Sequence, residues 1–224
     1  MVRHRHAVIG LVLLVQLVGS LARAAVVKNI STGIDPSTGL QLANNAADPD
    51  WVVAAGGDGG GYVGQATIAR SSPLPAVYQS DSASTASRWI AINSGFGLEG
   101  FSVPGTHYNF QTTVDLTGYD PATASIPSGR FAVDDGIIDV RINGTAVSIP
   151  GGSAQGLDKF YNLPANLGAG LFTPGVNTIT FELLNLSSSP QALRLEASVV
   201  ATPEPAALLF LPALAVFLTR SRRA

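Results

Sequence analysis

The side chains that could perform catalysis in this chain are few and widely spaced. Cysteine is absent, which excludes disulfides and thiol chemistry. Two of the three histidines lie within the first six residues, so His107 is the one left for acid–base chemistry. A serine triad needs such a histidine to face a serine and to be oriented by a carboxylate. The sequence has no Gly-x-Ser-x-Gly motif, so we expect a surface turn histidine and no enzyme.

Acidic side chains gather in two places that could hold a catalytic pair or a cation. One place has Asp48 and Asp50, and the other has Asp134, Asp135 and Asp139. Glycosidases use two facing carboxylates, whereas Ca²⁺ binds carboxylate and carbonyl oxygens in loops. Adjacent acids on a turn are usually solvated, and this spacing is not that of an EF-hand. We therefore assign no catalytic residue and no metal ligand, and a structural Ca²⁺ stays open.

A glycine-rich stretch, residues 59–64, formally matches the dinucleotide-binding pattern Gly-x-Gly-x-x-Gly. That pattern holds a pyrophosphate only between a strand and the N-terminus of a helix. Residues 65–70 are a weak helix start, and no acidic residue follows about 20 residues later inside a βαβ unit. The stretch predicts a flexible loop, and we expect no cofactor.

Sugar binding is a more specific functional hypothesis for these side chains than catalysis or cofactor binding. Such sites stack an aromatic ring on the sugar and contact its hydroxyls with Asp, Asn or Arg. The residue types are present in Trp51, Tyr62, Trp89, Asp58 and Arg88. For the three aromatic residues, however, the favoured interpretation is that they are packing anchors of a core, which is the more common use of Trp and Tyr.

The sequence pattern predicts that β-strands position these side chains. Short runs of alternating apolar and polar residues, separated by Gly and Pro, predict half-buried β-strands. Asn143-Gly144 predicts a two-residue hairpin turn. The runs cover residues 108–116, 138–142, 145–149, 178–184 and 193–199. Many short strands predict an all-β fold, an antiparallel β-sandwich of the jelly-roll kind, with long loops within residues 27–87.

The charge of the central region limits its partners. Residues 25–202 hold fourteen acidic and seven basic side chains, a net charge of about −7 at neutral pH. Phosphate binding needs a basic face, so we expect no nucleic-acid partner. The length of this region suits one domain with its own core.

The N-terminus predicts export. A basic start of Arg and His precedes an apolar stretch at residues 7–21. Ala22-Arg23-Ala24 then supplies small residues where signal peptidase needs them, so cleavage is expected after Ala24. An uncleaved membrane anchor is the alternative interpretation.

The C-terminus predicts a second membrane segment. Residues 206–218 are apolar and would span roughly 20 Å as a helix at about 1.5 Å per residue. That is short for a hydrocarbon core of about 30 Å, but arginines that snorkel at its end would hold it in place. These are Arg220, Arg222 and Arg223, and the positive-inside rule would keep them cytoplasmic. A plain tail anchor is the alternative.

The order of Pro203-Glu204-Pro205, an apolar run and terminal arginines resembles the PEP-CTERM sorting signal of Gram-negative bacteria. The resemblance implies recognition by an exosortase, with transient anchoring in the inner membrane before release. Residues 87–200, with Tyr108 to Pro121 as the longest matching stretch, resemble a recurrent domain of PEP-CTERM proteins. They are also similar to the galactose-binding-like jelly rolls of glycosidase accessory domains. This second resemblance implies a fold rather than an activity.

These observations predict three parts: a signal peptide at 1–24, a β-sandwich domain at 25–202 and a sorting and anchor segment at 203–224. The expected partners are signal peptidase and exosortase. We predict an exported protein of the cell surface or extracellular matrix with a structural or adhesive role. The alternative is a carbohydrate-binding module for exopolysaccharide.

Overall fold

The computed structural model describes residues 23–58, 62–69, 74, 76–80, 86–92, 105–149, 156–186 and 191–204. The predicted signal helix and C-terminal membrane helix lie outside these residues, as do Ala22, Pro205 and the last three arginines. Within the described part of the chain, no helix is long and apolar enough to cross a membrane.

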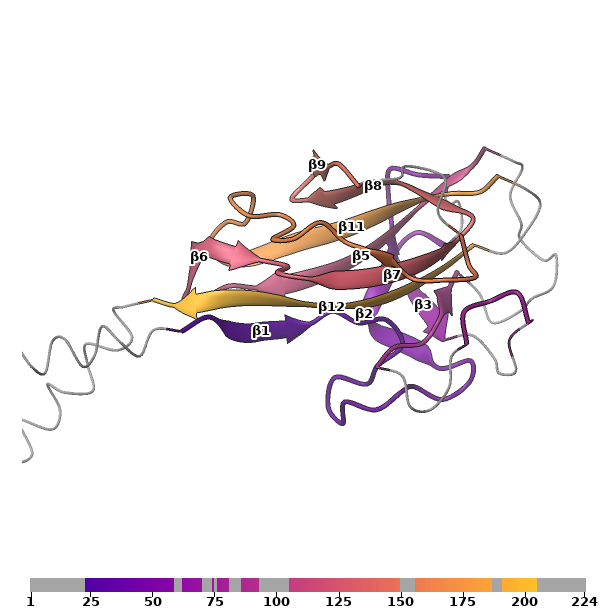
Figure 1. The fold of residues 1–224 in the computed structure, drawn as a ribbon, viewed down its shortest axis with the longest axis horizontal. Helices are drawn as coiled ribbons and strands as arrows, with labels where there is room; N and C mark the ends of the chain where they lie inside the picture. The colour runs from indigo at the N-terminus through magenta and orange to yellow at the C-terminus, as the bar shows by residue number, and fades with distance from the viewer. Residues whose placement is uncertain are drawn as a thin grey trace, which may run out of the picture.

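The described chain is all-β and its strands pair antiparallel, as the sequence predicts. They form a sheet that curls around a shared core (Figure 1). The strands are β1 (Ala25–Asn29), β2 (Ala47–Ala54), β3 (Ala66–Ala69), β4 (Ile90–Ala91), β5 (His107–Asp115), β6 (Tyr119–Ser125), β7 (Gly129–Asp134), β8 (Gly136–Ile142), β9 (Thr145–Val147), β10 (Tyr161–Asn162), β11 (Val176–Leu184) and β12 (Ala192–Pro203).

Strand β12 pairs with four other strands of this sheet. Its N-terminal half lies between β7 and β4, and its C-terminal half pairs with β1 and β6. From β4 the sheet continues through β3, β2, β5, β11 and β8 to β9, and β10 lies beyond β7 at the other end. Figure 1 shows β12 running the length of the domain beside β1. Strands distant in sequence therefore pair with the two edges of β12.

The alternating runs found in the sequence become β5, β8, β11 and β12, and these strand predictions are confirmed. In β11, Phe181 is fully buried and lies opposite Phe110 of β5 and Val140 of β8. Alternation places such residues on one face because successive side chains of a strand point to opposite sides. In each predicted strand, the face that carries the apolar residues is thus the buried one.

The hairpin turn at Asn143-Gly144 is confirmed as well. Both residues have positive φ, 51° and 81°, which a type I′ turn requires. The Asn143 Oδ1 also accepts a hydrogen bond from the Thr178 N–H at 2.9 Å, which ties the turn to β11. The return strand β9 ends at Val147, short of the predicted end at Ile149.

Two hydrophobic clusters pack on opposite faces of the sheet. The main core takes Phe131 and Val133 of β7, whereas Ala132 between them belongs to a smaller second cluster. That second cluster also contains Trp89 and Tyr78, whose rings meet edge to face at 5.1 Å between centroids. Tyr78 and Trp89 thus cover part of the outer face of the sheet.

Both ends of the described chain lie at the same end of the domain. Strand β1 pairs antiparallel with the end of β12, with Ala25 opposite Ala201. The β12 strand continues to Pro203, and the Glu204 N–H donates to the Gly118 carbonyl at 3.0 Å.

Asp48 ties the turn after β1 to strand β2. Its carboxylate accepts hydrogen bonds from the N–H groups of Gly33 (2.7 Å) and Asp50 (2.9 Å), and the residue is 1% exposed. Burial raises the pKa of Asp48 to about 6, and the charge of Asp50 adds to the rise. The expectation that this acidic pair is solvated is therefore wrong for Asp48, because its carboxylate is buried where it accepts these two backbone hydrogen bonds.

We expect Asp48→Asn to change how stability depends on pH. The folded chain holds the Asp48 proton up to about pH 6, against a pKa of 3.8 without these surroundings. The contribution of Asp48 to the free energy of unfolding should therefore fall by about 2 kcal/mol as pH rises from about 4 to about 7 in the wild type, and this fall should be absent in the variant. Urea unfolding of both proteins across this window measures the difference. Parallel stability curves for wild type and Asp48→Asn would contradict the raised pKa.

Candidate functional site

The two tryptophans predicted as sugar platforms are both inside the protein. Trp51 on β2 is 0% exposed and meets Phe181 edge to face at 5.9 Å. Trp89 is also 0% exposed, and its Nε1–H donates to the Gln79 carbonyl at 2.9 Å. A ring without an exposed face cannot stack on a sugar, so the sugar-binding interpretation is wrong for these two residues. Their favoured role, as packing anchors, is confirmed.

The other three residues of that predicted set also have structural contacts. Tyr62 is half-buried and packs against the main core. Asp58 is exposed, and its carboxylate accepts the His107 N–H at 2.8 Å. Arg88 is buried, and its guanidinium donates to the Leu42 carbonyl and to the Asn44 Oδ1. The predicted set therefore fixes turns and the core rather than lining one surface.

His107 lies in a strand rather than in the predicted turn. It begins β5, and its Nδ1 is 3.1 Å from the Oε1 of the buried Glu182. Arg141 donates to the other oxygen of Glu182 at 2.5 Å. Within the described residues the imidazole contacts this carboxylate and no serine hydroxyl. The arrangement is a cross-strand polar cluster on β5, β11 and β8.

The second acidic group is used in a similar structural way. Asp134 is 2% exposed and accepts a hydrogen bond from the Tyr78 hydroxyl, while Asp135 accepts the Leu186 N–H at 2.8 Å. The expectation that adjacent acids here are solvated is thus wrong for Asp134. Among the residues that the structure describes, no three His, Asp or Glu side chains are placed to bind a metal ion together.

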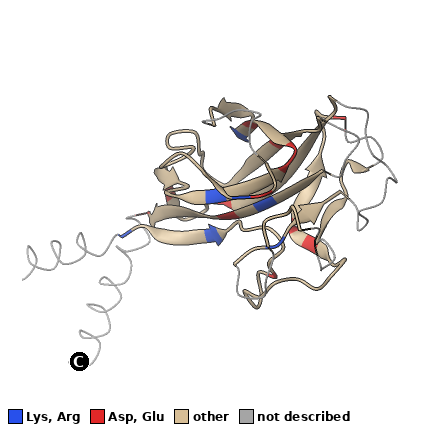
Figure 2. Ribbon diagram, turned by 45° about the vertical axis from the view of Figure 1, so that its right-hand side comes forward, with Lys and Arg blue, Asp and Glu red and all other residues tan. Residues whose placement is uncertain are grey.

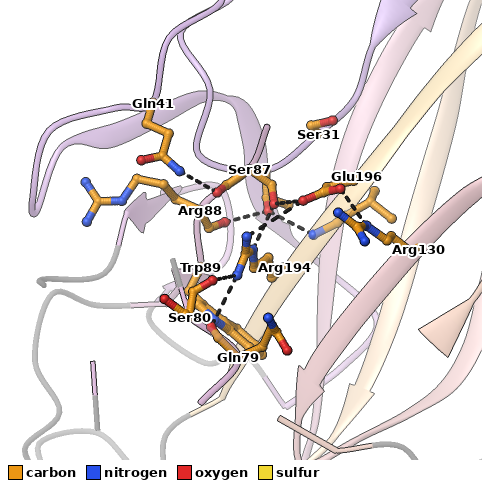
Figure 3. A network of polar contacts seen from close by, with 12 residues as sticks. Ser31, Gln41, Gln79, Ser80, Ser87, Arg88, Trp89, Arg130, Arg194 and Glu196 are labelled. Carbon is orange, nitrogen blue, oxygen red and sulfur yellow. Dashed lines mark hydrogen bonds and ion pairs between the residues drawn. The ribbon is translucent and has the colours of Figure 1, made fainter. Parts of the chain in front are cut away.

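A buried arginine on β12 organises the main polar network of the domain (Figure 3). Arg194 is 0% exposed, and its Nε donates to the Ser87 hydroxyl at 2.8 Å. Its Nη1 donates to the carbonyls of Gln79 and Ser80. A buried cation is tolerated only when it is paired and hydrogen-bonded, and here backbone carbonyls supply much of that pairing.

Glu196, two residues further along β12, extends this network to the surface. Its Oε1 accepts the Ser87 hydroxyl at 3.0 Å and lies 3.7 Å from the Arg194 Nη2. Its Oε2 accepts the Nε of Arg130 at 2.6 Å. Both arginines also lie over the Phe160 ring, at 4.3 Å for Arg130 and 4.8 Å for Arg194. One carboxylate and one ring thus fix two guanidinium groups.

Next to this network lies an open groove of about 580 Å³ along the outer face of β12. Its floor is β12, and its walls come from β1 on one side and from β7 and β10 on the other. Apolar residues such as Val26 and Val200 share the lining with polar ones, which are Asn29, Ser31, Ser128, Arg130, Asn162, Glu196 and Ser198. The groove is the candidate binding site because it joins amide and hydroxyl groups to an ordered guanidinium.

Sequence reasoning missed this groove, although part of its signal was present. Alternation on β12 correctly places Arg194, Glu196 and Ser198 on the face opposite the core. Alternation cannot show that Gln79, Ser80 and Ser87 cover Arg194 while Ser198 stays open, because these contacts join residues distant in sequence.

Charged positions are sparse over the described strands, and basic and acidic ones are interspersed (Figure 2). Compared with models of protein families, with curated proteins and with solved structures, the chain matches none of them. The candidate site is therefore argued from its own geometry.

We expect Arg194→Ala to destabilise the fold by about 3–5 kcal/mol, because it leaves polar groups buried without their cation. The matched control is Lys159→Ala, whose side chain is exposed and contacts only the Tyr161 ring among the described residues, and which should cost at most about 1 kcal/mol. Urea unfolding followed by tryptophan fluorescence measures both. Equal effects of the two substitutions would contradict a structural role specific to Arg194.

Proposed function

We propose that this chain is exported across the inner membrane of a Gram-negative bacterium and processed by an exosortase. The domain would then act at the cell surface or in the extracellular matrix as a structural or adhesive component. The boundaries of the domain support this. The first strand starts at Ala25, directly after the expected signal cleavage, and the last ends at Pro203, where the expected sorting motif begins.

The position of that motif carries the proposal. Glu204 is exposed, and β1 and β12 bring it to the same end of the domain as Ala24. A chain held by its C-terminal segment would thus be tethered at one end only. The opposite end and the outer face of β12 would stay free for contacts.

We further infer that the curled sheet is a jelly-roll-like sandwich. Strands β7 and β11 are far apart in the order of the sheet, yet both place phenylalanines, Phe131 and Phe181, in the main core. Two faces that share one apolar layer are the arrangement expected of a sandwich.

The alternative function is a carbohydrate-binding module for exopolysaccharide. The groove along β12 favours it, rather than the tryptophans, because amides, hydroxyls and an arginine are the groups that contact sugar hydroxyls.

Glu204→Ala combined with Pro205→Ala tests the processing. In a host with an exosortase, this variant should stay at full length in the inner membrane, whereas the wild type is shortened and released. Asp120→Ala with Pro121→Ala is the matched control, since it removes an Asp-Pro pair of β6 at the same end of the domain. Cell fractionation and mass spectrometry report both. Normal release of the Glu204 variant would contradict the proposal.

A further inference from the structure

We propose that the groove along β12 binds carboxylate-bearing polysaccharide, of the uronic acid kind, with Arg130 as the residue that recognises the carboxylate. This inference rests on the alternative function, polysaccharide binding, and does not depend on processing.

Arg130 is held in place and still accessible. Its Nε is bonded to Glu196 and its guanidinium lies over Phe160, yet the side chain is 51% exposed. Within the described part of the chain, its two terminal nitrogens make no hydrogen bond. The edge between them is the one that binds a carboxylate through two parallel hydrogen bonds. An arginine already fixed in this way loses little freedom when it binds a ligand.

The charge around the groove favours an anion. Two arginines, Arg130 and Arg194, share the single carboxylate of Glu196. The cluster therefore carries one excess positive charge, in a domain whose net charge is about −7. Because Arg194 is fully buried, its charge is screened less by salt than that of a surface residue. A ligand carboxylate would complete the pairing.

The rest of the groove suits a polyhydroxylated chain. Ser128 and Asn162 are exposed on one wall, and Ser198 lies on the floor. These three side chains make no hydrogen bond within the described residues, so they are available for hydroxyl groups. On the other wall, Asn29 accepts the Ser31 N–H through Oδ1, which leaves its amide nitrogen to donate. The groove is open along β12, which allows a segment of a polymer to lie in it.

Binding of polygalacturonate and of neutral dextran to the purified full chain in detergent tests this inference. Calorimetry should show binding of polygalacturonate only, weakened by added salt. Arg130→Gln should weaken it about tenfold or more, since a charge-assisted pair is lost. Asn162→Ala should cause a smaller loss.

Arg141→Gln is the matched control, because it removes one positive charge from β8 and should leave binding unchanged. Circular dichroism checks that each variant is folded. Equal binding of dextran, no binding of either polymer, or full binding by Arg130→Gln would each overturn the inference. Because binding is measured on purified protein, a failure of exosortase processing would not affect the result.

Discussion

The burial of Arg194 is the constraint on which the outer half of this structure depends. A cation at 0% exposure must be surrounded by acceptors, and the chain provides them by bringing Gln79, Ser80 and Ser87 onto β12. These three residues lie beside Tyr78 and Trp89 in the chain, so their contacts with Arg194 also hold the second hydrophobic cluster in place. The same requirement also sets Glu196 beside the cation, from where Glu196 orders Arg130 at the surface.

Strand β12 connects the features of this chain that bear on function. Its first half carries the buried arginine, its middle is the floor of the groove, and its end leads into Pro203 and Glu204. Pairing with β7 and β4 at one end and with β1 and β6 at the other holds both halves of this strand in the sheet. The groove therefore lies along the same strand whose end carries the expected sorting motif.

Local sequence patterns predicted the strands and the hairpin turn, because both depend on neighbouring residues. Alternation predicted β5, β8, β11 and β12, and Asn143-Gly144 predicted its hairpin because positive φ is a property of those residue types. Burial of Asp48 and Arg194 was not readable in this way. Each depends on which distant segment covers a strand face. The groove is missed for the same reason, since its walls come from strands about a hundred residues apart.

Hydrogen–deuterium exchange of the full chain, with and without a short oligogalacturonate, tests the central claim most directly. The account predicts slower exchange for amides at residues 128–130, 161–162 and 196–200, at the groove, and no change in β8 or β11. Unchanged exchange at the groove, or protection that appears only in β8 or β11, would contradict it.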